Sequence, residues 1–120
     1  MIIITNNPKF IGYKDIKVEY KKEEYLDVLY RARNYIHKNH ILLTHPLYGN
    51  ITPTTTLYRT LILKENDSID FFSVEIIENS INKVERIINT EKTKLLNSSI
   101  REDLEFIDYT LIIETIDQIK

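Results

Sequence analysis

The segment LLTHPLYGNITP, residues 42–53, decides how the fold of this sequence is interpreted, because an apolar run passes directly into a polar loop that contains proline. A shorter segment, IIITNNP, residues 2–8, has the same order of an apolar run, a threonine, a polar side chain and a proline. Three consecutive isoleucines are typical of a strand buried on both faces, and the Asn-Asn-Pro sequence ends it. Each segment therefore predicts a buried strand whose end carries polar side chains.

The residues between these two segments predict a strand, a helix and a further strand. Residues 16–20, IKVEY, alternate apolar and charged side chains, as in a strand with one buried face. Asn39 suits the left-handed backbone that closes a helix, and the strand at 40–44 completes a β-α-β unit with a parallel, right-handed crossover. The helix at 22–38 is predicted by apolar positions at intervals of three and four: Tyr25, Val28, Leu29, Ala32 and Ile36.

The second half of the chain predicts one more strand and two helices. The strand covers residues 57–64, and one of its faces carries Leu57, Arg59, Leu61 and Leu63. Helical spacing then runs from residue 70 or 73 to residue 89, with a hairpin return through IDFF, residues 69–72, as the rival interpretation. A capping box at Ser99 and Glu102 begins a third helix, whose predicted apolar stripe is Leu104, Ile107, Leu111 and Thr115 or Ile116.

These elements define an α/β protein with a small single-layer sheet of three or four strands, mixed or mostly parallel, about three helices and a Rossmann-like β-α-β unit. The chain is 42% hydrophobic and 28% charged, as in globular proteins. Because 120 residues is the size of one domain, we expect residues 1–120 to form a single α/β domain.

Composition excludes several classes of function. The formal net charge is -2 and cysteine is absent, so we expect no nucleic-acid partner, no attraction to an anionic membrane and no thiol chemistry. Two glycines, Gly12 and Gly49, cannot form a P-loop or a G-x-G-x-x-G loop, and the three histidines lack a nearby carboxylate. We therefore expect no cofactor and no metal. The N-terminus has no signal-peptide pattern and no run is long enough to span a bilayer, which predicts a cytoplasmic protein.

The polar loops after the two buried strands form the candidate site. Ligands of open parallel sheets lie beyond the carboxyl ends of the strands, and the two loops meet at one edge if their strands are neighbours. Amide, hydroxyl and imidazole groups suit a small polar or anionic ligand. The alternative is that Asn-Asn-Pro and Gly-Asn are ordinary turn residues that bind their own loops. The candidate ligand-binding residues are Asn6, Asn7, Thr44, His45, Gly49, Asn50 and Arg59.

Three segments of the sequence resemble one known family. IIITNNP at 2–8, YIHKNHILLTHPLYGNITP at 35–53 and LYRTLIL at 57–63 are similar to the GrdX family, small proteins encoded beside the glycine, sarcosine and betaine reductase systems of amino-acid-fermenting anaerobic bacteria. The family usually has glycine at the position of Asn39 and often proline at that of Leu57. The resemblance implies an accessory role in that metabolism, and the family motif marks six positions for testing: Asn6, Asn7, Pro8, His45, Pro46 and Gly49.

Three functions remain open. The first is an accessory binding protein, in which Asn7 orients a small metabolite such as an amino acid or an acyl phosphate, and His45 or Arg59 meets its negative charge. The second is an enzyme that uses His45 as general acid or base. The third is a protein-interaction module, in which the helices after Ser73 form a homodimer or bind a reductase component through surplus apolar positions: Ile76, Phe106, Ile112 and Ile113.

Overall fold

The computed structural model describes residues 1–48, 57–90 and 98–119. In these residues the chain forms a mixed sheet of four strands with three α-helices, which confirms the predicted α/β class. Helix α2 includes residues 71 and 72, so the hairpin through residues 69–72 is wrong. The elements in chain order are β1 (Ile2–Thr5), the 3-10 helix η1 (Pro8–Phe10), β2 (Lys17–Tyr20), α1 (Tyr25–Ile36), β3 (His40–Leu42), β4 (Thr60–Glu65), α2 (Phe71–Thr90) and α3 (Ser98–Ile119).

The strand order of the sheet is β2-β1-β4-β3. Strand β1 is parallel to β2 and antiparallel to β4, and β4 is in turn antiparallel to β3. Strands β1, β2 and β3 therefore run in one direction, and β4 runs against them. The predicted β-α-β unit has its strands in the same direction, but β1 and β4 lie between β2 and β3. Consequently the two strands that carry the polar loops, β1 and β3, are not neighbours.

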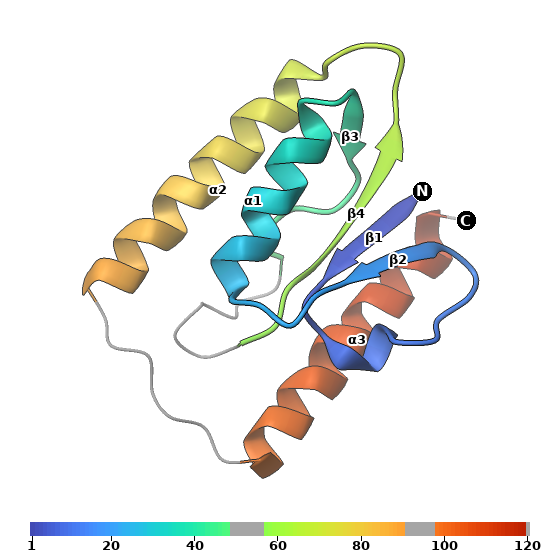
Figure 1. The fold of residues 1–120 in the computed structure, drawn as a ribbon, viewed down its shortest axis with the longest axis vertical. Coiled ribbons are helices and arrows are strands. Elements are labelled where there is room, and N and C mark those ends of the chain that lie inside the picture. Colours follow the sequence, from blue (N-terminus) through green and yellow to red (C-terminus); the bar gives the residue numbers. More distant parts are fainter. Residues whose placement is uncertain (49–56, 91–97, 120) are drawn as a thin grey trace.

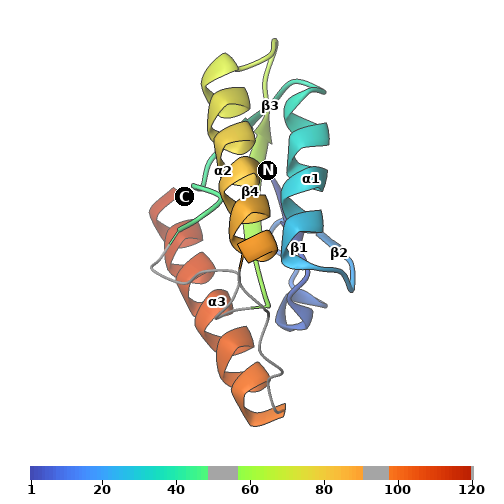
Figure 2. The ribbon, with the colours of Figure 1, turned by 90° about the vertical axis from the view of Figure 1, so that its left-hand side faces the viewer.

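Helices cover both faces of the sheet (Figures 1 and 2). Helices α1 and α2 pack together on one face, where Ile2 and Ile4 of β1 and Leu61 and Leu63 of β4 meet them. On the other face, Ile3 and Ile62 pack with residues of η1 and α3: Phe10, Ile112 and Ile116. The alternation along β1 and β4 thus divides their side chains between two cores, as expected for a sheet buried on both sides.

The helix ends follow local sequence signals. Glu24 and Asp27 form a capping box at the start of α1, since the side chain of each accepts from the backbone of the other. Asn39, with a φ of 63°, adopts the predicted left-handed conformation after the helix. At α2, Asp70 accepts from the Ser73 amide at 3.1 Å and from its hydroxyl at 2.6 Å. None of the described helices has both the length and the apolar composition needed to cross a membrane.

The apolar stripe predicted for α3 is confirmed in part, since Ile116 is buried and Leu104 and Leu111 are partly buried. Ile112 and Ile116 are each 1% exposed and form the core contacts, whereas Ile107 is 41% exposed. The buried position one turn before Ile112 is Asp108, a carboxylate. The pattern of apolar residues therefore placed one side of the buried face correctly but missed its centre, because the buried face of α3 includes a charged side chain.

Candidate functional site

The carboxyl ends of β1 and β3 and the amino end of β4 lie at one edge of the sheet, because β4 runs against both neighbours. We call this the strand-end edge. Polar side chains that are at most 8% exposed lie here: Thr5, Asn6, Asn7, Thr44, Arg59, Thr60 and Asp108. Buried polar groups in proteins normally have hydrogen-bond partners, so the partners of each group show whether it is available to a ligand.

The side chain of Asn6 ties three backbone segments together. Its Nδ2 donates to the carbonyls of Glu23 and Leu57 at 2.9 and 2.8 Å, and its Oδ1 accepts from the Arg59 amide at 2.9 Å. These bonds fix the end of β1 against the residues that precede α1 and β4. The amide of Asn6 is therefore committed to partners inside the protein.

The side chain of Asn7 is also fully used. Its Oδ1 accepts from the Lys9 amide at 3.0 Å and caps η1. Its Nδ2 donates to the Glu105 carbonyl and to Asp108 Oδ2, both at 2.9 Å. Asn7 thus connects the end of β1 to α3 and has no amide hydrogen left for a ligand.

Asp108 gathers three donors from different parts of the chain. In addition to Asn7, the Thr60 hydroxyl donates to Oδ2 at 2.7 Å, and the Tyr48 hydroxyl donates to Oδ1. Thr60 also shares a 2.6 Å hydrogen bond with the Thr5 hydroxyl. One carboxylate on α3 therefore holds the end of β1, the start of β4 and the residues after β3.

The polar residues after β3 have separate roles. Thr44 is buried, and its hydroxyl accepts from the Ile62 amide at 3.1 Å, which continues the pairing of this segment with β4. His45 is exposed, and its Nδ1 accepts from the Leu47 amide at 3.0 Å within its own turn. Two other candidate residues, Gly49 and Asn50, lie outside the described residues.

The structure brings part of the candidate set together. Asn6 and Arg59 are directly bonded, Asn7 bonds to α3, and His45 bonds within its turn. The candidate residues do not form one cluster because β4 lies between β1 and β3. The loop after β1 therefore meets the start of β4 instead of the loop after β3.

Arg59 lies inside the protein between two tyrosine rings. It is 1% exposed, and its Cζ is 3.9 Å from the ring centroid of Tyr48 and 4.9 Å from that of Tyr25. Its Nη1 donates to the Tyr48 carbonyl at 3.0 Å. Stacking of a guanidinium on aromatic faces is favourable, and more so away from water. The predicted alternation is confirmed for Arg59, Leu61 and Leu63, which lie on the face covered by α1, whereas Leu57 precedes β4 and lines a groove at the strand-end edge.

An open groove of about 520 Å³ lies at the strand-end edge. Its walls come from the end of β2, the residues before α1, the residues before β4 and the first half of α3. Asn6 lies in the groove wall, as do two tyrosines and charged residues of both signs. The lining residues are Asn6, Pro8, Tyr20, Lys22, Glu23, Glu24, Leu57, Tyr58, Arg101 and Glu105.

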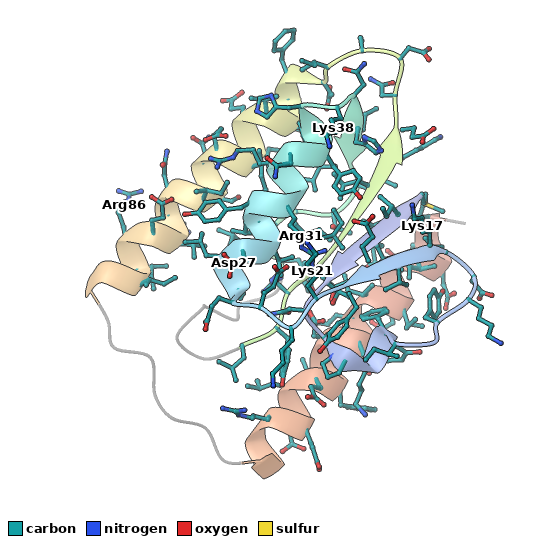
Figure 3. All side chains as sticks on the ribbon, in the orientation of Figure 1. Lys17, Lys21, Asp27, Arg31, Lys38 and Arg86 are labelled. Atoms are coloured by element: carbon teal, nitrogen blue, oxygen red, sulfur yellow. The ribbon has the colours of Figure 1, made fainter. Side chains whose placement is uncertain are left out.

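The charges around the groove are partly paired. Arg31 on α1 bonds Glu23 at 2.5 Å and donates to the carbonyls of Thr5 at 3.0 Å and Glu19 at 3.2 Å. Its side chain extends from α1 toward β2 in Figure 3. Arg31 therefore neutralises Glu23 and holds the ends of β1 and β2, which leaves a balance of positive and negative side chains along the lining.

Tyr58 is a neutral hydrogen-bond donor in this groove. Its hydroxyl donates to Glu105 Oε1 at 2.8 Å. Burial, followed by the hydrogen bond to Glu105, raises the pKa of Tyr58 to about 12. The phenol therefore stays protonated at neutral pH, and Glu105 is held in position beside Arg101 on the same helix.

A groove of the same volume lies at the opposite edge of the sheet, where Lys17, His40 and Lys64 contribute to the lining. We favour the groove at the strand-end edge because it lies beyond the carboxyl ends of β1 and β2, where α/β proteins bind ligands. Asn6 in its wall also bonds the backbone amide of Arg59, whose charge is buried. Burial of a charge is costly unless a specific contact compensates it.

Sequence reasoning did not select Tyr25, Tyr48 or Asp108 as members of the site. Tyr25 and Asp108 both occupy positions on helix faces that pack toward the sheet. An acidic residue four positions before Ile112 and eight before Ile116 is the signal that was available for Asp108. A buried carboxylate on a core face needs donors, and the strand ends supply them.

The fold and its strand-end edge define a small α/β protein with a ligand-sized groove. A family model described as GrdX-like protein matches residues 2–117. The chain therefore belongs to the GrdX-like family, as its N-terminal motifs predict. No curated protein and no solved structure matches the chain.

Proposed function

We propose that this protein is an accessory binding protein whose strand-end groove holds a small polar metabolite. The observation that carries this proposal is the lining: Lys22 and Arg101 face the same space as Glu24 and Glu105. A groove with both signs of charge complements a ligand that has both an amino group and a carboxylate. Tyr20 and Tyr58 add aromatic surface that favours the cationic end.

The family resemblance implies which metabolites to test. It associates the protein with glycine, sarcosine and betaine reductase systems, whose substrates are small and zwitterionic. An amino acid or an N-methylated amino acid is therefore the preferred ligand class, and an acyl phosphate is the second. His45 is exposed and remains a candidate for a catalytic role on such a ligand.

A thermal-shift panel tests the proposed function. We expect glycine, sarcosine or betaine to raise the melting temperature by several degrees at about 100 times the dissociation constant, because a ligand at that ratio stabilises by about 2.7 kcal/mol. Acetyl phosphate, phosphate and common nucleotides complete the panel. Glu105→Gln and Arg101→Gln should weaken the response, since each removes one charge from the lining.

The control is Glu75→Gln, an exposed substitution on α2 that should leave the response unchanged. The absence of a saturable shift with every compound would contradict the binding function.

A second candidate function, protein interaction, is favoured by exposed aromatic residues on the helices. Phe71 and Phe72 at the start of α2 are 78% and 70% exposed, and Phe106 on α3 is 61% exposed. Large apolar side chains in contact with water indicate a contact surface when they occur together, as Phe71 and Phe72 do. Phe106 lies on α3, on the opposite face of the sheet, and would belong to a separate contact. Of the surplus apolar residues considered, Phe106 is available for such a contact, whereas Ile112 belongs to the core.

Mass measurement tests the interaction. If α2 and α3 form a homodimer, size exclusion with light scattering should give twice the chain mass at micromolar concentration. Phe71→Ser with Phe72→Ser, or Phe106→Ser, should return the mass to that of one chain, while Asn79→Ser on the exposed face of α2 should have no effect. A monomeric parent protein would eliminate the homodimer.

A further inference from the structure

The outer edge of strand β2 has backbone groups without partners. Strand β2 is an outer strand of the sheet and pairs only with β1 among the described strands (Figure 1). The amide of Lys21 donates to the Thr5 carbonyl of β1 at 3.1 Å, so the odd-numbered residues of this segment direct their backbone groups toward β1. The N–H and C=O of Val18 and Tyr20 therefore point away from the sheet, and they have no hydrogen-bond partner among the described residues.

The two outer edges of the sheet differ in how they are protected. At the far edge, the outward amide of Leu42 on β3 donates to the Ser73 hydroxyl of α2 at 3.0 Å. Beside β2 there is open space instead, a groove of about 500 Å³ lined by the strand and by residues 10–14. Because an uncovered edge readily accepts a further strand, the side chains of β2 determine which strand fits it.

The side chains around β2 are complementary to themselves when two copies run antiparallel. A two-fold axis at Val18 places this residue opposite Val18 of the second copy. Lys17 then lies opposite Glu19 of the second copy, and Glu19 opposite its Lys17, because these positions are equally far from Val18. Ile16 lies opposite Tyr20 in the same way. The segment thus pairs opposite charges with each other and apolar side chains with each other.

The backbone of β2 fits this register. In an antiparallel ladder, residues that exchange both hydrogen bonds alternate with residues whose side chains lie closer together and whose backbones do not bond each other. Val18 directs its N–H and C=O outward, so it takes the hydrogen-bonded position on the axis. Lys17 and Glu19 then take the positions of closer side chains, where opposite charges interact best.

The charged groups of this register are available for such a contact. Lys17 is exposed on β2 (Figure 3) and forms no ion pair with the described residues. Glu19 accepts a hydrogen bond from the Tyr35 side chain, and a carboxylate with one such bond can accept several more. A lysine on an edge strand usually discourages pairing. Here each lysine would face a glutamate, so the same charge favours a second copy of β2.

We propose that β2 pairs with β2 of a second copy of this chain about a two-fold axis at Val18, which joins the two sheets into one continuous sheet. Lys17 of each copy bonds Glu19 of the other. The interface does not involve the exposed phenylalanines of α2 and α3. It adjoins the strand-end groove, because Tyr20 contributes to the lining of that groove.

Charge reversal tests this register. We expect size exclusion with light scattering to give twice the chain mass for the parent at about 100 μM, a concentration suited to a small interface. Lys17→Glu places two carboxylates opposite each other, and Glu19→Lys places two ammonium groups opposite each other. Each variant alone should raise the dissociation constant of the dimer at least about tenfold, because symmetry repeats the repulsive contact on both sides of the axis.

Mixing the two variants separates lost pairing from lost folding. In an equimolar mixture, the register places every new carboxylate of Lys17→Glu opposite an ammonium group of Glu19→Lys. The mixture should therefore recover the doubled mass that neither variant shows alone, which a misfolded chain would not do. Val18→Pro should also give single chains with the fold retained, since it removes an outward N–H from an edge strand, where proline is tolerated.

The control is Lys38→Glu, which makes the same charge change at an exposed residue after α1 and should leave the mass at twice that of one chain. A parent protein that remains a single chain at about 100 μM overturns the proposal. A dimer that survives both charge reversals, or that only the phenylalanine substitutions dissociate, overturns it as well, because its interface then lies elsewhere.

Discussion

Replacing Asp108 by alanine is expected to lower the free energy of unfolding by about 3 kcal/mol, roughly 1 kcal/mol for each buried donor that loses its acceptor. The three donors are Asn7 Nδ2 and the hydroxyls of Thr60 and Tyr48. They come from the end of β1, from β4 and from the residues after β3. The loss should therefore loosen α3 from the strand-end edge. Chemical denaturation of the parent and the variant measures the difference.

Two further variants test whether the lost hydrogen bonds cause the loss of stability in Asp108→Ala. Asp108→Asn keeps one acceptor oxygen but places an amide group against the donors. We therefore expect it to lower the free energy of unfolding by about 1 to 2 kcal/mol. Asp103→Ala removes an exposed carboxylate from the same helix and should change stability by less than about 0.5 kcal/mol. A loss in Asp108→Ala no larger than that of Asp103→Ala would contradict the role given to the carboxylate.

Replacing Asn6 by aspartate is expected to cost at least about 3 kcal/mol at neutral pH, although the two side chains have the same shape. The new oxygen would face the carbonyls of Glu23 and Leu57, which now accept from Nδ2. Two hydrogen bonds become repulsive contacts, and a charge is buried at a position that is 4% exposed. Urea unfolding at neutral pH measures the cost.

The pH dependence of the stability of Asn6→Asp tests whether repulsion by the new charge causes the loss. Burial and the adjacent carbonyl oxygens raise the pKa of a carboxyl group in this position, because both disfavour its charged form. The protonated acid can donate again, so the stability difference from the parent should shrink as the pH falls below the raised pKa. Asn34→Asp, an exposed substitution on α1, should show no such recovery. A stability difference from the parent that does not change with pH would exclude repulsion between the new carboxylate and the carbonyls as its cause.

Much of the fold could be predicted because its signals are local. The spacing of Val28, Leu29, Ala32 and Ile36 predicts the buried face of α1, and Asn39 predicts its left-handed end. The strand order could not be predicted in this way. The insertion of β4 between β1 and β3 depends on which long-range pairing buries the most apolar surface, and no local pattern reports that choice.

The sequence predicts that polar residues lie at the strand ends, but it does not predict which groups they bond. Asn6, Asn7 and Thr44 do lie at the strand ends, yet they satisfy backbone groups and α3 instead of remaining available. An asparagine that binds a ligand and one that closes a loop have the same sequence pattern. Arg59 differs because its alternation with Leu61 places it inward, where a cation needs a partner.

The antiparallel strand at the centre of the sheet has a consequence for synthesis on the ribosome. Strand β1 pairs along one side with β4, so the pairing of Thr5 with Thr60 cannot form until β4 has been translated. Among the described strands, β3 pairs only with β4. Until residue 65 has emerged, the nascent chain can assemble β1 with β2 but cannot join β3 to them. The last described strand to be translated closes the sheet from the inside, and non-local pairing of this kind slows folding. Edges of β1 and β3 stay open during that interval, and unpaired edges are the surfaces through which incomplete chains associate.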